Sequence, residues 1–385
     1  MTNDSEDGAN GTGGVAGIAL QVPDVVAAAS RALGRPLAEP VELAGGDWSM
    51  VLRCRDPADG TMIVKAYPPT AEGASSFAAE AAGLEIARGS GLTPELLAVD
   101  RHRQAIVMSD LGQGGSLADA LLGDSAEAAR SATLSWAAAC GQLSAAASTR
   151  RARFDAARAG YLAGRPDDRH AAGLPGRVAA AAGEAAKLGV SSPAGLDAEL
   201  ARVVAAISDG QPAVFSPGDV CPDNNLLTSD GIRFLDFEEA GFQPAFLDAA
   251  YIRMPFSTCW CVFRFPADLS AAAEEAYRAQ ASLAWPELAD DVVWAAGMRL
   301  AVAAWTLSST SWLLRRAMSA DAPMNPDAES PHTRQLIRYR WQALATDLEA
   351  AGDLPAIAGL MRSLLAATVS WQAPDLPLYP AFRAR

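Results

Sequence analysis

Positive charge is scarce in this sequence relative to negative charge. Its 385 residues carry 31 Lys and Arg against 45 Asp and Glu, which gives a formal net charge of −14 at pH 7. A protein that binds nucleic acid through the phosphate backbone needs the opposite balance. We therefore expect no nucleic-acid partner, whereas a cationic ligand would be favoured electrostatically.

Cysteine and histidine are too few, and too unfavourably spaced, for a disulfide framework or a structural zinc site. The closest pair, in Cys259-Trp260-Cys261, has one intervening residue and no second Cys or His pair nearby. The sequence favours buried, reduced thiols for all five cysteines, at positions 54, 140, 221, 259 and 261. No histidine stands near a motif, so no Ser-His-Asp arrangement is predicted from His102, His170 or His332.

The pattern also lacks a signal peptide and a clear membrane span. Residues 1–16 are rich in Gly, Asn and acidic residues, without a basic region followed by an apolar stretch, so we expect a disordered tail. The most apolar long stretch, 292–314, contains Arg299 and a Ser-Ser-Thr-Ser cluster, which disfavours insertion into a membrane. These features predict a cytoplasmic protein with no membrane partner, and they leave its oligomeric state open.

The secondary-structure patterns divide the chain into two parts. Half of the residues are apolar, and the length allows two subdomains with sizeable cores. Residues 17–112 mix a helix pattern at 75–88 with strand patterns at 42–55, 61–67, 94–100 and 104–108. Residues 113–385 are mostly helical, interrupted by short strand patterns between 213 and 237. The predicted helices there cover about 125–148, 175–187, 195–208, 269–281, 290–317, 332–350 and 354–369. We predict an α+β fold with a break at 111–115, where glycines cluster.

One polar constellation lies in that interruption. Segment 217–224 reads Pro-Gly-Asp-Val-Cys-Pro-Asp-Asn, and segment 232–238 reads Ile-Arg-Phe-Leu-Asp-Phe-Glu. Asp219 and Asn224 share a loop, and Asp236 ends a strand pattern. Phosphoryl transfer needs such a set: one carboxylate orients the attacking hydroxyl, while an amide oxygen and a second carboxylate hold Mg²⁺ on the nucleotide phosphates.

These segments resemble the catalytic loop and metal-binding motif of the aminoglycoside phosphotransferase and choline kinase family. The usual form there is His-Gly-Asp, four residues, Asn, and later Ile-Asp-Phe-Glu or similar. The resemblance implies a bilobal protein-kinase-like fold, with a nucleotide-binding lobe at 17–112 and a catalytic and substrate-binding helical lobe at 113–385. It further implies that Asp219 is the catalytic base and that Asn224 and Asp236 bind Mg²⁺.

The loop departs from the family pattern at two positions. Pro217 stands where the family has His, and Asp223 stands where it usually has a loop Gly. The family's His mainly supports loop geometry, so its replacement bears on loop packing more than on chemistry. Proline fixes one backbone angle and can substitute in part.

Lys65 and Glu80 stand where the resemblance places the kinase ion pair. Lys65 interrupts the apolar strand pattern Met-Ile-Val-Lys-Ala, which requires that its ammonium be paired or reach solvent. Glu80 lies in an otherwise apolar stretch of the predicted helix, although Glu72 and Glu85 are also available. The resemblance implies that Lys65 contacts the α- and β-phosphates of ATP.

A glycine pair falls where the family's nucleotide-covering hairpin should be. Gly45 and Gly46 would let backbone amides approach the phosphates, and Ser49 would add a hydroxyl. Most Gly-Gly pairs are simple turns, so the assignment of this pair to the nucleotide-covering hairpin rests on its place in the sequence relative to the other motifs.

The segment 106–112, Ile-Val-Met-Ser-Asp-Leu-Gly, resembles the family's hinge. The backbone from Ser109 to Leu111 would then bind the adenine edge, with Met108 behind it. A core methionine explains Met108 almost equally well. Asp248 resembles a family position near the start of a helix, and we interpret it as structural.

The acceptor is not identified by any motif. Trp294, Trp305 and Trp312 share a helix pattern that suits either a binding face or the core. The acidic stretch 319–331 could receive ammonium groups, or it could be a solvated loop. We predict an ATP- and Mg²⁺-dependent kinase for a hydroxyl of a small polar molecule, such as an aminoglycoside or other antibiotic, an amino sugar or a related metabolite. A regulatory pseudokinase, suggested by Pro217, and a helical scaffold without a nucleotide site are the alternatives.

Overall fold

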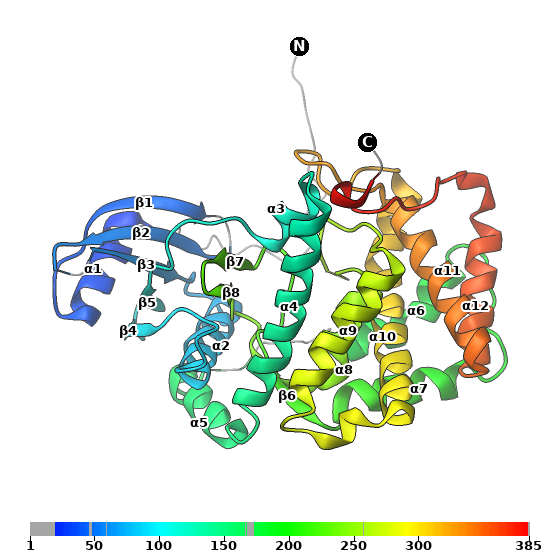
Figure 1. The fold of residues 1–385 in the computed structure, drawn as a ribbon, viewed down its shortest axis with the longest axis horizontal. Coiled ribbons are helices and arrows are strands. Elements are labelled where there is room, and N and C mark those ends of the chain that lie inside the picture. Colours follow the sequence, from blue (N-terminus) through cyan, green and yellow to red (C-terminus); the bar gives the residue numbers. More distant parts are fainter. Residues whose placement is uncertain are drawn as a thin grey trace, which may run out of the picture.

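A computed structural model of the chain describes residues 20–45, 48–58, 60–165, 167, 173–256 and 258–383. The predicted tail at 1–16 lies outside these residues. Figure 1 shows a β-sheet with its helices on one side of the molecule and a larger, mostly helical part on the other. This is the α+β arrangement that the sequence predicts.

The sheet has five antiparallel strands in the order β1-β2-β3-β5-β4. Their bounds are β1 Ala38–Gly45, β2 Met50–Asp56, β3 Gly60–Ala66, β4 Leu96–Asp100 and β5 Ala105–Ser109. The predicted strands at 61–67, 94–100 and 104–108 are therefore confirmed within one or two residues, and β2 and β3 form the predicted hairpin. In that hairpin Val51 lies opposite Lys65.

Alternation along the strands gives the sheet two different faces. On β5, Ala105 and Val107 pack with helix α1 (Val22–Leu33), whereas Ile106 and Met108 belong to the main core on the other face. This follows from the two-residue period of side chains in a strand. The same period turns Lys65 of β3 to the face opposite Val64, away from α1. Helix α1 is absent from the sequence-based prediction.

Helix α2 (Ala71–Ala87) lies between the sheet and the helical part and is buried on nearly all sides. It begins where the Thr70 hydroxyl accepts a hydrogen bond from the Gly73 amide, a standard N-cap. The Phe77 ring meets Tyr161 of helix α5 (Arg151–Leu162) edge to face. Small residues along α2 allow this close packing, and the prediction of a helix at 75–88 is confirmed with an earlier start.

The rest of the chain is mainly helical. The sequence predicts α4, α6, α7 and α9 to α12 to within a few residues, whereas it misses α3 and α5. The bounds are α3 Leu117–Leu122, α4 Ala126–Ala146, α6 Leu174–Ala186, α7 Leu196–Asp209, α8 Ala245–Arg253, α9 Ala267–Ala281, α10 Asp291–Ser319, α11 Thr333–Ala351 and α12 Pro355–Ala367.

Helix α10 is the one described helix that is long and apolar enough to cross a membrane. Most of its apolar stretch is buried inside the structure, with Leu307, Leu313 and Leu314 at 0% exposure. It is a core helix of the larger part, and this length and composition are common in such helices.

Two short antiparallel ribbons interrupt the helices and carry the predicted constellation. Strand β6 (Ala213–Ser216) pairs with β9 (Gly241–Pro244), and β7 (Asn225–Thr228) pairs with β8 (Gly231–Phe234). The loop between β6 and β7 contains Asp219, and the residues after β8 contain Asp236. Both loops therefore emerge at the border between the sheet and the helices.

Candidate active site

A cleft of about 320 Å³ lies between the sheet and the β7–β8 ribbon with its adjoining loops, a size typical of small-ligand sites. It brings together side chains from both parts of the molecule. Those from the sheet side are Leu43, Val51, Arg53, Ile63, Lys65, Pro94, Met108, Ser109, Asp110, Leu111 and Gly112. Those from the ribbon side are Asp223, Asn224, Leu226, Leu235 and Asp236.

Lys65 forms the predicted ion pair with Glu80. Its Nζ lies 2.8 Å from Glu80 Oε2, 2.8 Å from Asp236 Oδ1 and 3.4 Å from Glu238 Oε2. Burial favours the neutral amine, but the three carboxylates together raise the pKa of Lys65 above its ordinary value. The lysine is thus a permanent cation in a site where acidic groups outnumber it.

Among the three candidate glutamates, only Glu80 meets Lys65. Glu80 is fully buried, and its Oε2 also accepts hydrogen bonds from the Tyr67 hydroxyl at 2.6 Å and the Phe237 amide at 3.4 Å. Glu85 instead contacts Arg153 and Tyr161, and Glu72 lies exposed in the first turn of α2. Tyr67, which the sequence analysis did not consider, therefore belongs to this cluster.

The predicted catalytic loop, residues 217–224, depends on a glycine at position 218. Gly218 has φ +93°, and a Cβ there would lie 2.3 Å from the Glu239 carbonyl oxygen. Its amide donates a hydrogen bond to Ser216 Oγ at 2.9 Å, and Ser216 Oγ donates to Asp248 Oδ1 at 2.9 Å. Asp248 thus supports the loop through Ser216, in agreement with the structural interpretation of this residue.

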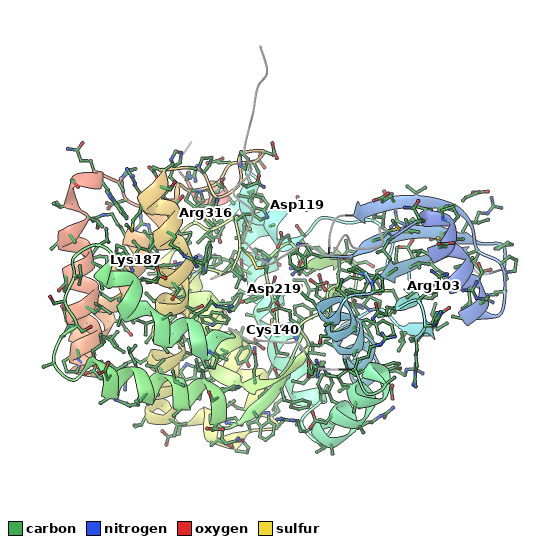
Figure 2. The ribbon with its side chains drawn as sticks, turned by 180° about the vertical axis from the view of Figure 1, so that it is seen from behind. Arg103, Asp119, Cys140, Lys187, Asp219 and Arg316 are labelled. Atoms are coloured by element: carbon green, nitrogen blue, oxygen red, sulfur yellow. A yellow bond between two sulfur atoms is a disulfide. The ribbon has the colours of Figure 1, made fainter. Side chains whose placement is uncertain are left out.

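Asp219 lies near the middle of the molecule, between the sheet and the helices (Figure 2). Burial raises the pKa of its carboxyl to about 7, with further contributions from the negative charges of Glu239, Asp223 and Asp236. A carboxyl with a pKa close to neutrality suits a group that takes up and releases a proton.

Asn224 and Asp236 are brought together by the register of the β7–β8 ribbon. Asn225 lies opposite Phe234, and the Leu235 amide donates to the Asn224 carbonyl oxygen at 3.1 Å. The Asn224 side-chain nitrogen donates to the Asp219 carbonyl oxygen at 3.3 Å. Its amide oxygen therefore remains as the atom that can serve a ligand, and both Asn224 and Asp236 line the cleft.

The predicted hinge residues Met108, Ser109 and Leu111 line the opposite end of the cleft. Met108 is 3% exposed and also belongs to the core, so it packs in the core and lines the cleft at the same time. The Ser109 amide donates to the Glu95 carbonyl oxygen at 3.0 Å. The Leu111 amide is therefore the better donor for a nucleotide base.

An ion pair that the sequence analysis did not anticipate fixes this hinge. Arg53 of β2 donates to both carboxylate oxygens of Asp110, at 2.7 and 3.1 Å, and to the Gly112 carbonyl oxygen at 3.0 Å. Partial burial alone would favour the neutral acid, but the bonds from Arg53 and its neighbours lower the pKa of Asp110. The two residues lie 57 positions apart, a distance across which sequence spacing carries no signal.

The predicted glycine hairpin is only partly described. Gly45 ends β1 and pairs with Met50, Gly46 lies outside the described residues, and Ser49 is half-buried between the strands. The described lining of the cleft includes Leu43 and Val51 from this hairpin but neither Gly45 nor Ser49. The structure thus places the hairpin beside the cleft without bringing these two residues into its wall.

Asn225 is a structural residue of the loop that the sequence analysis missed. It is 1% exposed, its Oδ1 accepts from the Leu117 amide at 2.9 Å, and its Nδ2 donates to the Pro222 carbonyl oxygen at 2.9 Å. The buried amide therefore ties the catalytic loop to the start of α3. A run of two asparagines, with Asn224 facing the cleft, is the signal that could have suggested it.

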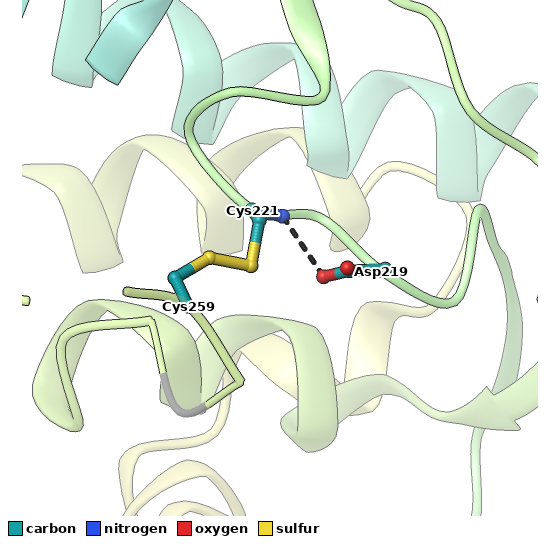
Figure 3. A group of neighbouring side chains, drawn as sticks. All are labelled: Asp219, Cys221 and Cys259. Carbon is teal, nitrogen blue, oxygen red and sulfur yellow. Dashed lines mark hydrogen bonds between the residues drawn. A yellow bond between two sulfur atoms is a disulfide. The ribbon is translucent and has the colours of Figure 1, made fainter. Parts of the chain in front are cut away.

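The expectation of five reduced thiols is wrong for two of the cysteines. Cys221 and Cys259 form a disulfide across 38 positions, whereas Cys54, Cys140 and Cys261 are buried free thiols. Figure 3 shows this link beside Asp219, whose carboxylate accepts a hydrogen bond from the Cys221 amide. The pair forms because the segment after α8 folds back onto the catalytic loop, which cysteine spacing does not reveal.

The structure accounts for the two candidate acceptor regions by other contacts. Trp294 and Trp305 are buried, and their indole nitrogens donate to Glu274 and to the Leu247 carbonyl oxygen. In the acidic stretch, Glu329 pairs with Arg383 and Asp321 lies 3.4 Å from His332. The core interpretation is therefore the better one for Trp294 and Trp305, whereas Trp312 is half-buried. Internal partners satisfy Glu329 and Asp321.

One comparison with known proteins identifies a family for this chain, and another identifies its fold. Residues 40–290 match a family model described as the phosphotransferase enzyme family. No curated protein sequence matches the chain significantly. The solved structures similar to this one include an aminoglycoside phosphotransferase from Alicyclobacillus acidocaldarius, at 15% identity and a TM-score of 0.51, covering 91% of this chain and 98% of that chain.

A putative aminoglycoside phosphotransferase from Ralstonia eutropha is similar at 12% identity, with a TM-score of 0.51 and coverage of 88% of this chain and 98% of that one. A choline kinase from Cryptosporidium parvum is similar at 14% identity and a TM-score of 0.49, with coverage of 84% and 93%. At these identities the likeness to the Alicyclobacillus and Ralstonia structures, each with a TM-score of 0.51, shows the fold alone. It confirms the protein-kinase-like architecture predicted from the sequence.

Proposed function

The chain belongs to the phosphotransferase enzyme family, and on that premise we propose that it uses Mg-ATP to phosphorylate a hydroxyl group of a small polar molecule. One observation carries the proposal. Lys65, Asn224 and Asp236, which come from distant parts of the sequence, line a single cleft, and Asp219 lies on the loop that ends in Asn224. This is the set of groups that phosphoryl transfer requires.

The proposed role of Asp219 is that of catalytic base. The hydroxyl oxygen of the acceptor attacks the γ-phosphorus, the bond from that phosphorus to the β,γ-bridging oxygen breaks, and the hydroxyl proton passes to the Asp219 carboxylate. ADP leaves as the second product. The raised pKa of Asp219, about 7 because of burial and neighbouring negative charge, fits this role near neutral pH.

The donor set fits Mg²⁺. Carboxylate and amide oxygens are the ligands that this hard cation prefers, and we propose that Asp236 and the side-chain oxygen of Asn224 hold it. When bound, Mg²⁺ neutralises negative charge on the nucleotide phosphates. The Asn224 side chain is already oriented by its nitrogen, which donates to the Asp219 carbonyl oxygen.

The nucleotide would lie along the sheet side of the cleft. Lys65 is proposed to contact the α- and β-phosphates while Glu80 keeps it in place. The Leu111 amide and the Ser109 carbonyl would bind the base, and the hairpin with Gly45, Gly46 and Ser49 would cover the phosphates. The nucleotide-binding lobe would then be residues 17–112, and the catalytic lobe 113–385.

The acceptor would approach Asp219 from the ribbon side. Asp223 and Glu239 contribute negative charge there, which favours a polar acceptor with a cationic group, such as an aminoglycoside, another antibiotic or an amino sugar. A role in antibiotic resistance and a location in the cytoplasm, where ATP is available, belong to the same proposal. We propose neither a nucleic-acid nor a membrane partner. The pseudokinase alternative finds no support, and the presence of Lys65, Asn224 and Asp236 in the lining of one cleft favours an active kinase.

An acceptor screen tests this function. The purified protein is incubated with Mg-ATP and single hydroxyl compounds, starting with aminoglycosides, glucosamine and nucleoside antibiotics. ADP release is followed, and products are examined by mass spectrometry for the addition of one phosphoryl group. We expect acceptor-dependent ADP release by the wild type and none by Asp219→Asn. Binding of Mg-ATP without transfer to any hydroxyl compound would contradict the proposal.

A further inference from the structure

A short segment that follows helix α8 contacts the catalytic loop. We call this segment, Thr258 and Cys259, the strap. Thr258 Oγ1 donates to Asp219 Oδ1 at 3.2 Å, and the disulfide joins Cys259 to Cys221. Cys221 lies two positions after Asp219 in the sequence. The strap therefore holds the loop at the proposed base itself, through Thr258, and immediately beside it, through the disulfide that Figure 3 shows.

These contacts act on one oxygen of the carboxylate. Asp219 Oδ1 accepts hydrogen bonds from both Thr258 Oγ1, at 3.2 Å, and the Cys221 amide, at 3.3 Å. Two donors on the same oxygen fix the rotation of the carboxylate and direct the second oxygen, Oδ2, elsewhere. A base held in this way needs less reorganisation when a hydroxyl group arrives.

Helix α8 anchors the strap and also the other flank of the loop. The Tyr251 hydroxyl, on the buried face of α8, lies 3.2 Å from Thr258 Oγ1. Asp248, one turn earlier on the same helix, accepts from Ser216, which in turn accepts from the Gly218 amide. One rigid helix thus holds the backbone before Asp219 and the side chain of Asp219.

The need for such support follows from Pro217. The resemblance noted in the sequence places a loop-supporting histidine at this position, and proline has neither a side-chain donor nor a backbone N–H. Thr258 supplies a side-chain donor to the loop from another element, and the disulfide supplies a covalent restraint. The Cα atoms of Cys221 and Cys259 are 6.1 Å apart, within the usual range for a disulfide.

We propose that Thr258 and Cys259 are positioning residues that orient Asp219 for proton transfer and replace the support that Pro217 does not give. The inference rests on the proposed role of Asp219 as the base. It assigns to the strap an effect on the transfer step and none on nucleotide binding, because neither residue lines the described wall of the nucleotide cleft.

The first test uses Thr258→Val, which keeps the side-chain shape and removes the donor, with Thr258→Ser as the rescue. Hydrogen exchange of the peptide covering 217–224 is compared in the full-length proteins, together with slow hydrolysis of Mg-ATP, in which water replaces the acceptor. We expect about fivefold faster exchange and about tenfold lower kcat in Thr258→Val, at an unchanged KM for ATP. Thr258→Ser should return both the exchange rate and kcat most of the way to their wild-type values.

The second test addresses the disulfide by counting thiols in the denatured protein. We expect three titratable thiols before reduction, from Cys54, Cys140 and Cys261, out of five in the sequence. Dithiothreitol reduces the link by thiol–disulfide exchange, giving two electrons and two protons to form two thiols and closing to its own cyclic disulfide. The reduced protein and Cys259→Ser should both show the faster exchange and lower kcat.

Cys261→Ser serves as the matched control, because it alters a buried thiol two positions away that has no hydrogen bond to the loop among the contacts described. It should keep wild-type exchange at 217–224 and wild-type kcat. Five free thiols in the untreated protein, or unchanged exchange and kcat in Thr258→Val, would overturn the inference. Asp219→Asn separates the two proposals: if it hydrolyses Mg-ATP like the wild type, the proposed function fails first.

Discussion

The two sides of the cleft are held in place by different kinds of contact. On the proposed nucleotide side, Lys65 is buried among the carboxylates of Glu80, Asp236 and Glu238. On the proposed acceptor side, Asp219 is held by neutral donors, an amide and a hydroxyl, with a disulfide next to it. One side therefore depends on charge balance, and the other depends on geometry.

This difference corresponds to what each side has to do. Lys65 Nζ lies 2.8 Å from Asp236 Oδ1, and in the proposed reaction both side chains would turn to phosphate or metal when a nucleotide binds. Ion pairs around a shared lysine allow such an exchange of partners, because Glu80 keeps the ammonium neutralised throughout. As the proposed base, Asp219 would accept a proton along one direction, and a fixed carboxylate suits that role better than a mobile ion pair.

The largest expected effect comes from disturbing the charge balance on the nucleotide side. Lys65→Met leaves the buried Glu80 carboxylate without its counter-charge, and the free energy of unfolding should fall by about 3–5 kcal/mol. Adding Glu80→Gln should restore at least half of this loss, because no buried charge of that pair remains. Chemical denaturation of the two single variants and the double variant measures the coupling.

Lys187→Met is the matched control for that cycle. Lys187 forms an exposed pair with Glu184 on α6 at 2.7 Å, so its loss should change stability by no more than about 0.5 kcal/mol. If Lys65→Met lowers the free energy of unfolding no more than this control does, the nucleotide side does not depend on charge balance. The two sides of the cleft would then not differ in the way described above.

Asp248 tests whether a deeply buried acid on the acceptor side contributes to the stability of the protein. Burial raises the pKa of Asp248 to about 7, so the native state holds this proton more tightly than the unfolded state. The associated stability is present at about pH 4 and is lost as the pH rises through 7. Asp248→Asn keeps a side-chain oxygen that can accept hydrogen bonds from Ser216 and Gln243. At pH 8 its free energy of unfolding should be about 2 kcal/mol higher than that of the wild type.

The exposed acid Asp268, which pairs with Arg130, is the control for that measurement. Asp268→Asn should lower stability slightly at pH 8, because the pKa of Asp268 is lowered by its hydrogen bond from Arg130. A loss of stability at pH 8 in Asp248→Asn would show that the acceptor side, too, relies on a buried charge.

The pH dependence of transfer sharpens the comparison at Asp219. A base with a pKa of about 7 is active when deprotonated, so kcat/KM should fall on the acid side, about tenfold from pH 7 to pH 6 at most. Asp223→Asn removes a neighbouring negative charge and keeps an acceptor for Trp260 Nε1. Because the pKa of Asp219 should then fall, the decrease of kcat/KM on the acid side should move to lower pH. If kcat/KM of the wild type falls only near pH 4, Asp219 is not a base with a pKa of about 7.

The smallest expected effect concerns the packing that joins the two sides. A Cβ at Gly83 of α2 would lie 2.8 Å from Ala240 Cβ and 3.1 Å from Phe237 Cδ1, next to Asp236. Gly83→Ala should therefore cost about 1 kcal/mol of stability and weaken Mg-ATP binding. Gly183 in α6 has open space around it, so Gly183→Ala should gain up to about 1 kcal/mol from helix propensity. Equal gains in both variants would show that α2 is free to shift.

Sequence reasoning located the charged and polar groups that are proposed to carry the chemistry. Lys65 and Glu80 interrupt apolar patterns, and Asp219, Asn224 and Asp236 stand at a characteristic spacing, so local sequence suffices to select them. The structure brings Lys65 within 2.8 Å of both Glu80 and Asp236. Their roles remain predictions until the variants above are measured.

The groups that hold those residues in place were largely missed. The Tyr67 hydroxyl, the Arg53–Asp110 pair, Thr258 and the Cys221–Cys259 link each act across the fold on a partner that no local pattern names. Whether a threonine meets an aspartate 39 positions earlier depends on where α8 ends and how the chain turns back. Such contacts follow from tertiary packing, and a single sequence records them only as ordinary polar residues.

The measurement that tests this account most directly is the behaviour of Asp219→Asn in two assays on the same preparation. We predict that Mg-ATP binds with a dissociation constant within about threefold of the wild-type value, while phosphoryl transfer falls by at least about a thousandfold. Wild-type transfer in this variant would show that Asp219 is not the base. Loss of Mg-ATP binding together with transfer would show that the two sides of the cleft are not separate.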